Sequence, residues 1–214
     1  MLTSGLVTLG VALTTMSLIR PVLRWLPEPA DAPDKPTYRE LGSVRFVAAC
    51  TLISAVATLI AWSTLPRGIQ PMWWVLSSVG VALAAIDART TWLPLRLTQL
   101  SWGLMLMGAL ITPLWGGAWR TLLYAGVGAT AAGLLYLLVW MASRGGFGFG
   151  DVRFAPLLGA ATAAHSWSML TSALVLGTLI GAAHGLVRLL RRRPGGFPYA
   201  PSMLAGAYLA CWWV

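Results

Sequence analysis

The sequence predicts an all-α fold, a polytopic membrane bundle of about eight transmembrane helices, one of them short, with the N-terminus outside. Apolar residues occupy 57% of the 214 positions and charged residues only 10%, and the mean hydropathy is +0.74. A soluble domain carries about 25% charged residues, so this composition excludes one. Apolar runs of roughly 20 residues, the length that spans a bilayer core, recur along the whole chain.

Seven of these runs approach or reach the length of a membrane span, and in chain order they are 2–19, 44–65, 71–87, 97–115, 120–142, 166–188 and 198–214. An eighth run, 152–164, is short, and it can cross where the bilayer thins locally. The first run has no basic residue before it, and Arg20 and Arg24 follow it. That order is the reverse of a secretory leader and predicts a retained first helix.

The basic residues predict the orientation of the bundle. With eight crossings and the N-terminus outside, all fifteen Lys and Arg residues except Arg67 and Arg120 lie on the cytoplasmic side, as the positive-inside rule requires. With seven crossings, the cluster from Arg191 to Arg193 would lie outside. Because the basic residues are spread over several loops, the net charge of +9 is explained by contact with the lipid bilayer, and no nucleic-acid partner is predicted.

The chain divides into two predicted regions. Residues 1–43 comprise the first transmembrane helix and a short cytoplasmic linker, and residues 44–214 form a membrane-embedded core. The linker, about 21–43, is rich in proline, which disfavours regular structure. Glycines recur every four residues in the segment 166–188, at Gly177, Gly181 and Gly185. This spacing places them on one helix face, where a neighbouring helix can approach closely.

Two aspartates, Asp87 and Asp151, are the candidate functional residues. The chain contains six acidic residues, and the other four, Glu28, Asp31, Asp34 and Glu40, fall together in the polar linker. Ionisable side chains next to membrane segments are costly to keep, so two of them with no other acid nearby indicate a functional site. In the eight-segment topology the chain crosses out and back between Asp87 and Asp151. The two carboxylates therefore return to the same membrane face at similar depth.

A pair of neighbouring carboxylates favours hydrolytic chemistry. Two aspartates brought together and partly desolvated cannot both ionise, so they share one proton. The ionised member takes a proton from water as general base while the protonated member hydrogen-bonds the scissile carbonyl, which gives a tetrahedral diol. The proton belongs to the coupled pair rather than to either residue. Cys50 and Cys211 lie in distant spans with no nearby histidine, so neither a metal nor another cofactor is predicted.

Glycines precede the second aspartate. Gly148 and Gly150 lack Cβ atoms and permit positive φ, so an extended peptide can approach the carboxylate, and we expect both to be substrate-binding positions. A phosphate loop is disfavoured because no Lys-Ser or Lys-Thr pair follows the glycines. Structural alternatives remain for each acid taken alone. Asp151 suits the cap of the helix that follows, and Asp87 is close enough in sequence to pair with Arg89.

At these residues the chain resembles the type IV prepilin peptidases, membrane aspartic proteases that carry a Gly-x-Gly-Asp motif. Gly148-Phe149-Gly150-Asp151 matches that motif, and the hydrophobic and basic residues Val152-Arg153 follow it as in the family. The family's first aspartate ends a helix and precedes a proline, as Asp87 precedes Pro94. Its last helix begins with a Pro-aromatic-small-Pro element, which is similar to Pro198-Tyr199-Ala200-Pro201. The resemblance covers roughly residues 40 to 214.

The resemblance implies an activity and a location. Family members cut the short basic leader from prepilins or pseudopilins at the cytoplasmic face of the bacterial plasma membrane, the inner membrane. Asp87 and Asp151 match the catalytic pair, and Gly148 and Gly150 match the motif glycines. Bifunctional members also carry a four-cysteine zinc region after the first helix and N-methylate the new amino terminus. Residues 21–43 contain no cysteine, so the resemblance implies a peptidase-only form without a cofactor.

Two other classes of protein are alternatives for this sequence. An intramembrane aspartyl protease like signal peptide peptidase shares the Gly-x-Gly-Asp motif, but its Pro-Ala-Leu element near the last helix is missing here. A proton-coupled transporter, or an inactive assembly factor of a pilus or secretion apparatus, would use the acids for ion coupling or structure. A transporter is expected to show midplane acids and internal repeats. No sequence pattern selects one prepilin or pseudopilin substrate or predicts an oligomeric state.

Overall fold

The computed structural model describes residues 2–28, 36–144, 146–192 and 196–213. The described residues form helices and turns without a strand, which confirms the all-α prediction. Six helical stretches are long and apolar enough to cross a membrane. The chain is therefore a multi-pass membrane protein, as its composition indicates.

The long helices follow the predicted spans in chain order. They are α1 (Leu2–Trp25), α2 (Val44–Thr64), α5 (Leu95–Ile111), α6 (Trp119–Ala142) and α8 (Trp167–Leu190). Between α2 and α5, the crossing Arg67–Thr90 contains α3 (Gln70–Val75), the π-helical turn Leu76–Gly80 and α4 (Val81–Thr90).

Two helices are short. α7 (Phe149–Ala163) has 15 residues and begins slightly before the predicted run 152–164. α9 (Ala200–Ala210) has 11 residues, fewer than the predicted run 198–214. Proline lacks a backbone N–H and is tolerated only in the first helical turn, so Pro198 lies before α9 and Pro201 lies at its start. The predicted order of eight apolar segments is thus retained, with both α7 and α9 short.

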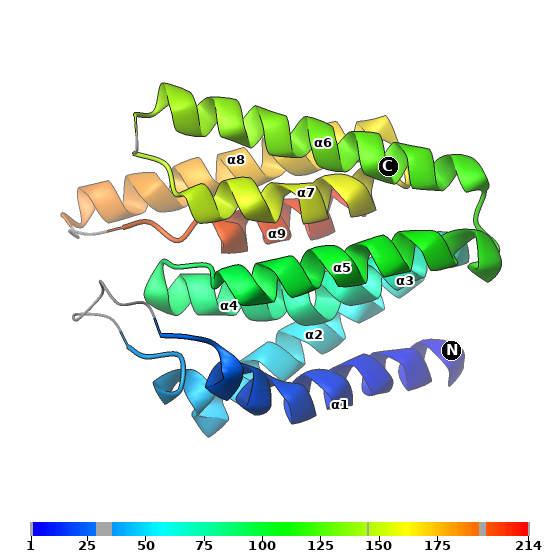
Figure 1. Ribbon diagram of the computed structural model, residues 1–214, viewed down its shortest axis with the longest axis horizontal. Coiled ribbons are helices and arrows are strands. Elements are labelled where there is room, and N and C mark those ends of the chain that lie inside the picture. The colour runs from blue at the N-terminus through cyan, green and yellow to red at the C-terminus, as the bar shows by residue number, and fades with distance from the viewer. Residues whose placement is uncertain (1, 29–35, 145, 193–195, 214) are drawn as a thin grey trace.

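Neighbouring segments run in alternate directions along the long axis of the bundle (Figure 1). The ends of α1 and α4, the starts of α7 and α9, and the described linker residues 36–43 lie at one end, on the left of Figure 1. We call this the linker end. Arg67 is the first residue of the 3-10 turn Arg67–Ile69, and Arg120 is the second residue of α6; both elements start at the opposite end. Arg193 and the linker residues 29–35 lie outside the described residues.

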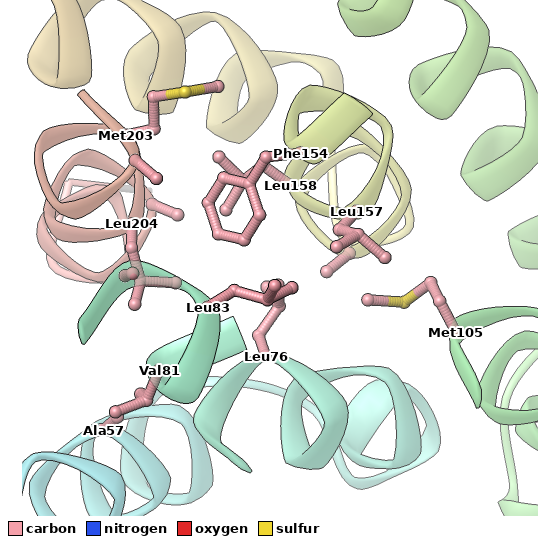
Figure 2. Close-up of a cluster of buried hydrophobic side chains, with 14 of the residues drawn as sticks. Ala57, Leu76, Val81, Leu83, Met105, Phe154, Leu157, Leu158, Met203 and Leu204 are labelled. Carbon is pink, nitrogen blue, oxygen red and sulfur yellow. The ribbon is translucent and has the colours of Figure 1, made fainter. Parts of the chain in front are cut away.

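The core lies where α7 meets α4 and α9. Most of α7 is buried, and Figure 2 shows Phe154 of α7 beside Met203 of α9 and Leu83 of α4. By contrast, α1, α6 and α8 expose large apolar side chains such as Leu6, Leu134 and Leu179. Exposed apolar surface of this extent is typical of helices that contact lipid. The short helix α7 is therefore shielded by its neighbours while the outer helices face the bilayer.

Glycines permit the closest helix contacts. A Cβ at Gly177 of α8 would lie 3.2 Å from the Cα atom of Met203 in α9, and a Cβ at Gly181 would overlap the ring of Tyr199. A Cβ at Gly185 would meet nothing within 4 Å. The predicted glycine face therefore packs against α9 at Gly177 and Gly181, and it ends before Gly185.

Candidate active site

A cavity of about 300 Å³ opens at the linker end, between the end of α4 and the start of α7. The four residues singled out in the sequence, Asp87, Asp151, Gly148 and Gly150, all line it. The other lining residues are Thr91, Trp92, Leu93, Phe149, Arg153 and Phe197. The fold thus brings together two motifs that lie far apart in the chain.

Asp87 lies in the last turns of α4 and is only 4% exposed. Its Oδ2 atom accepts a hydrogen bond of 3.1 Å from the backbone N–H of Ala200, the first residue of α9. The first N–H groups of a helix have no partner within the helix, and the helix dipole favours negative charge there. The Pro198–Pro201 element therefore starts a helix whose N-terminus holds the Asp87 carboxylate.

Asp151 lies in the first turn of α7, and it is 5% exposed. Its Oδ1 atom is buried and has no hydrogen-bond partner among the described residues. The carboxylate is also close enough to Asp87 for the two charges to interact. A buried polar atom without a partner costs free energy, so it calls for an explanation beyond packing. A helix cap made through Oδ2 would still leave Oδ1 without a partner.

The motif glycines lie at the start of α7. Gly148 has a φ of −70° and Gly150 is helical, so neither uses the positive φ that glycine permits. A Cβ at Gly148 would lie 3.0 Å from Oδ2 of Asp151, and a Cβ at Gly150 would lie 3.1 Å from the Leu93 side chain. The freed space is thus occupied by Asp151 and Leu93. A role for either glycine in binding substrate stays a prediction.

The chain turns sharply after Asp87. Thr91 adopts the left-handed conformation (φ 56°, ψ 25°), and its N–H donates a 2.7 Å hydrogen bond to the carbonyl of Asp87. A β-branched residue in this region is strained, and such strain concentrates at functional sites. The turn directs Thr91, Trp92 and Leu93 onto the cavity wall. No sequence pattern singled out these three residues as part of a site, although Pro94 signals a helix end just before it.

An aromatic cluster, formed by Tyr136, Phe147, Phe197 and Tyr199, packs beside the cavity. The ring centroids of Phe147 and Tyr199 are 5.2 Å apart, and those of Phe197 and Tyr199 are 5.9 Å apart. The Tyr199 ring lies over Gly181, and its hydroxyl donates a 3.3 Å hydrogen bond to Oγ1 of Thr178. Because Ala200 follows directly, these contacts fix the backbone N–H that binds Asp87.

The donor groups near the cavity do not form a metal site. Among the described residues, no three His, Cys, Asp or Glu side chains lie close enough together to hold a metal ion. Cys50 and Cys211 are buried free thiols in α2 and just after α9. His184 packs edge to face on Phe197, with ring centroids 4.9 Å apart. The ionisable residues that line the cavity are Asp87, Asp151 and Arg153.

Comparison with known proteins identifies the family. The model of the type IV leader peptidase family matches residues 74–186, which include both aspartates. The chain belongs to this family. It is also similar to curated relatives named prepilin leader peptidase/N-methyltransferase. The relative from Bacillus subtilis (strain 168) is 32% identical over 142 residues, which cover 64% of this chain and 53% of the relative.

Two relatives from Aeromonas carry the same name. The Aeromonas salmonicida (strain A449) protein is 30% identical over 172 residues, covering 76% of this chain and 54% of the relative. The Aeromonas hydrophila protein is 32% identical over 170 residues, which cover 74% of this chain and 53% of the relative. The chain thus spans about half the length of the curated relatives it matches. No solved structure matches it significantly.

Proposed function

We propose that this protein is a membrane aspartic endopeptidase that removes the leader peptide of type IV prepilins or pseudopilins at the cytoplasmic face of the plasma membrane. The observation that carries the proposal is the pair of buried carboxylates, Asp87 and Asp151, on one cavity at the linker end of the bundle. Membership of the type IV leader peptidase family and the names of the relatives support the same activity.

The two aspartates divide the chemistry between them. The buried pair shares one proton, because two adjacent negative charges in a site of low polarity repel each other. The ionised carboxylate removes a proton from a water molecule as it attacks the peptide carbonyl, and the protonated one hydrogen-bonds the carbonyl oxygen. The N–H of Ala200 stabilises negative charge on Asp87 throughout. The diol then collapses as a proton passes to the leaving amine.

The position of the cavity suits a substrate that is itself a membrane protein. The cavity lies at one end of the bundle, and with the N-terminus outside this end faces the cytoplasm, where most basic residues are expected. A leader peptide emerging from the membrane would reach the carboxylates past the half-exposed rings of Trp92 and Phe149 on the rim. Cleavage would then fall next to the apolar segment of the substrate.

The proposed form is a peptidase without methyltransferase activity. The curated relatives are named for both activities, but this chain contains two cysteines in all, and neither lies in the linker. The experiment that tests the function is cleavage of a panel of prepilins and pseudopilins by the purified protein, followed by mass spectrometry. We expect a cut leader and an unmethylated new N-terminus. Intact substrates across the panel would contradict the proposed activity.

Chelation is expected to leave cleavage unchanged. Two carboxylates supply both the base and the acid in the proposed mechanism, and the described residues include no group of three His, Cys, Asp or Glu side chains that could hold a metal ion. The measurement compares initial cleavage rates before and after dialysis against EDTA. Inhibition by EDTA that added zinc reverses would contradict the two-carboxylate mechanism.

A methyl group at Gly181 is expected to slow catalysis. The Gly181→Ala substitution places a Cβ against the Tyr199 ring and shifts Ala200 away from Asp87, so kcat should fall about 10- to 100-fold with KM nearly unchanged. Gly185→Ala, one helical turn away on α8, meets nothing within 4 Å and is the matched control. Adding Tyr199→Leu to Gly181→Ala should restore part of the rate. Equal kcat values for the Gly181 and Gly185 variants would show that Tyr199 does not position Asp87.

A further inference from the structure

A second hollow runs along α2 and α4 and is separate from the aspartate cavity. It consists of two adjoining cavities of about 480 Å³ and 630 Å³ that share the lining residues Ile53, Ala85 and Ala88. We call it the α2–α4 groove. It has no lining residue in common with the aspartate cavity. The peptidase mechanism therefore leaves it without a role.

The groove is apolar along most of its length and basic at one end. Its inner part is lined by aliphatic side chains of α2, α4 and α9, and by Tyr208, whose hydroxyl is hydrogen-bonded to Ser77 at 2.7 Å. Its outer part, at the linker end, is lined by Arg45, Arg89 and Glu40. The Glu40 carboxylate already accepts a 2.9 Å hydrogen bond from the backbone N–H of Thr37.

Two arginines, Arg45 and Arg89, lie at the mouth of the groove. Neither Arg45 nor Arg89 forms a salt bridge with any residue that the structure describes. Two guanidinium groups beside an apolar groove complement a ligand with an anionic head and a hydrocarbon tail. Guanidinium groups also match phosphate oxygens in geometry, each with several donors in one plane.

The length of the groove favours a lipid over a transmembrane helix. Its lining residues on α2 run from Arg45 to Ile60, which at 1.5 Å per residue is about 23 Å. One leaflet with its headgroup region is about 20 Å deep, whereas a membrane-spanning helix needs about 30 Å of apolar contact. The two arginines lie at one end of the groove, as expected for a ligand that occupies a single leaflet and has one charged headgroup.

We propose that the α2–α4 groove binds one anionic phospholipid of the cytoplasmic leaflet. Its phosphate lies between Arg45 and Arg89, and an acyl chain lies along the aliphatic faces of α2, α4 and α9. The bound lipid contacts α4 and α9, the two helices that the hydrogen bond from Ala200 to Asp87 joins. The proposal does not depend on the peptidase activity.

Lipid retention in native mass spectrometry tests the site. The full-length protein is placed in nanodiscs containing phosphatidylglycerol and phosphatidylcholine with identical acyl chains, and the lipid that stays bound on release is identified. We expect one phosphatidylglycerol per chain. The double variant Arg45→Gln/Arg89→Gln should weaken its retention about 25-fold, since each arginine near a membrane surface contributes about fivefold. Arg45→Lys/Arg89→Lys should keep most of it.

A matched control separates the groove from general surface charge. Arg144→Gln/Arg191→Gln removes two exposed arginines at the same end of the bundle that do not line the groove, and it should retain lipid like the parent protein. Equal loss in this control, or equal retention of phosphatidylcholine and phosphatidylglycerol, would overturn the proposal. Release of the bound lipid by a prepilin substrate or by a second copy of the chain would assign the groove to that partner instead.

Discussion

Replacing either Asp87 or Asp151 with asparagine is expected to lower the rate of leader cleavage by at least about 1,000-fold. Asparagine keeps the size of the side chain but neither removes a proton from water nor shares one with its neighbour. Both side chains are almost fully buried on the same cavity, and its lining contains no third acidic residue to act as base in place of the one replaced. The measurement is the initial rate of cleavage of a purified prepilin, with helix content followed by circular dichroism.

Glu28→Gln is the control for charge removal at the linker end. Glu28 accepts a 2.9 Å hydrogen bond from the backbone N–H of Tyr38 in the linker and does not line the aspartate cavity. We expect its cleavage rate to stay close to that of the parent protein. Full activity in Asp87→Asn or Asp151→Asn, with the helices intact, would remove that residue from the mechanism.

The largest effect on stability is expected from Gly128→Ala in α6. A Cβ at Gly128 would overlap the Cβ of Ala163 and lie 2.5 Å from the carbonyl oxygen of Gly159 in α7. Backbone atoms cannot move aside as a flexible side chain does, so the two helices must separate. Overpacking of this kind costs about 3 kcal/mol or more. The free energy of unfolding, measured by denaturant titration in mixed micelles, reports the change.

Gly126→Ala provides a close comparison, because Gly126 lies two residues earlier on the same helix and a Cβ there meets nothing within 4 Å. It makes the same change in chain flexibility and helix propensity without the contact. We expect its free energy of unfolding to equal that of the parent protein or to be slightly higher, since alanine favours the helix. If both variants unfold alike, α6 and α7 do not approach each other as closely as the structure shows.

The sequence was sufficient to predict the six long apolar helices among the described residues and the placement of the two aspartates on one cavity. Both depend on properties that are local in the chain, namely apolar runs of span length and the rarity of acids outside the linker. Once the number of crossings is known, topology alone returns Asp87 and Asp151 to one end of the bundle. The structure places them on one cavity there.

The contacts around the aspartates were beyond sequence reasoning because they join distant parts of the chain. The hydrogen bond from Ala200 to Asp87 joins residues 113 positions apart. The contact between the Tyr199 ring and Gly181 depends on how α8 packs against α9. The contact between Gly148 and Asp151 is another that sequence alone does not show. The backbone of Gly148 has an ordinary φ, and a Cβ there would lie 3.0 Å from Oδ2 of Asp151.

The most direct test of the central claim, that Asp87 and Asp151 act as one catalytic unit, is the cleavage rate of the double variant Asp87→Asn/Asp151→Asn beside those of the two single variants. Residues that act as a unit show strongly non-additive losses. The shared-proton mechanism predicts that the double variant cleaves prepilin no more slowly than either single variant. A loss in the double variant equal to the product of the two single losses would show that the aspartates act independently, and it would contradict the account.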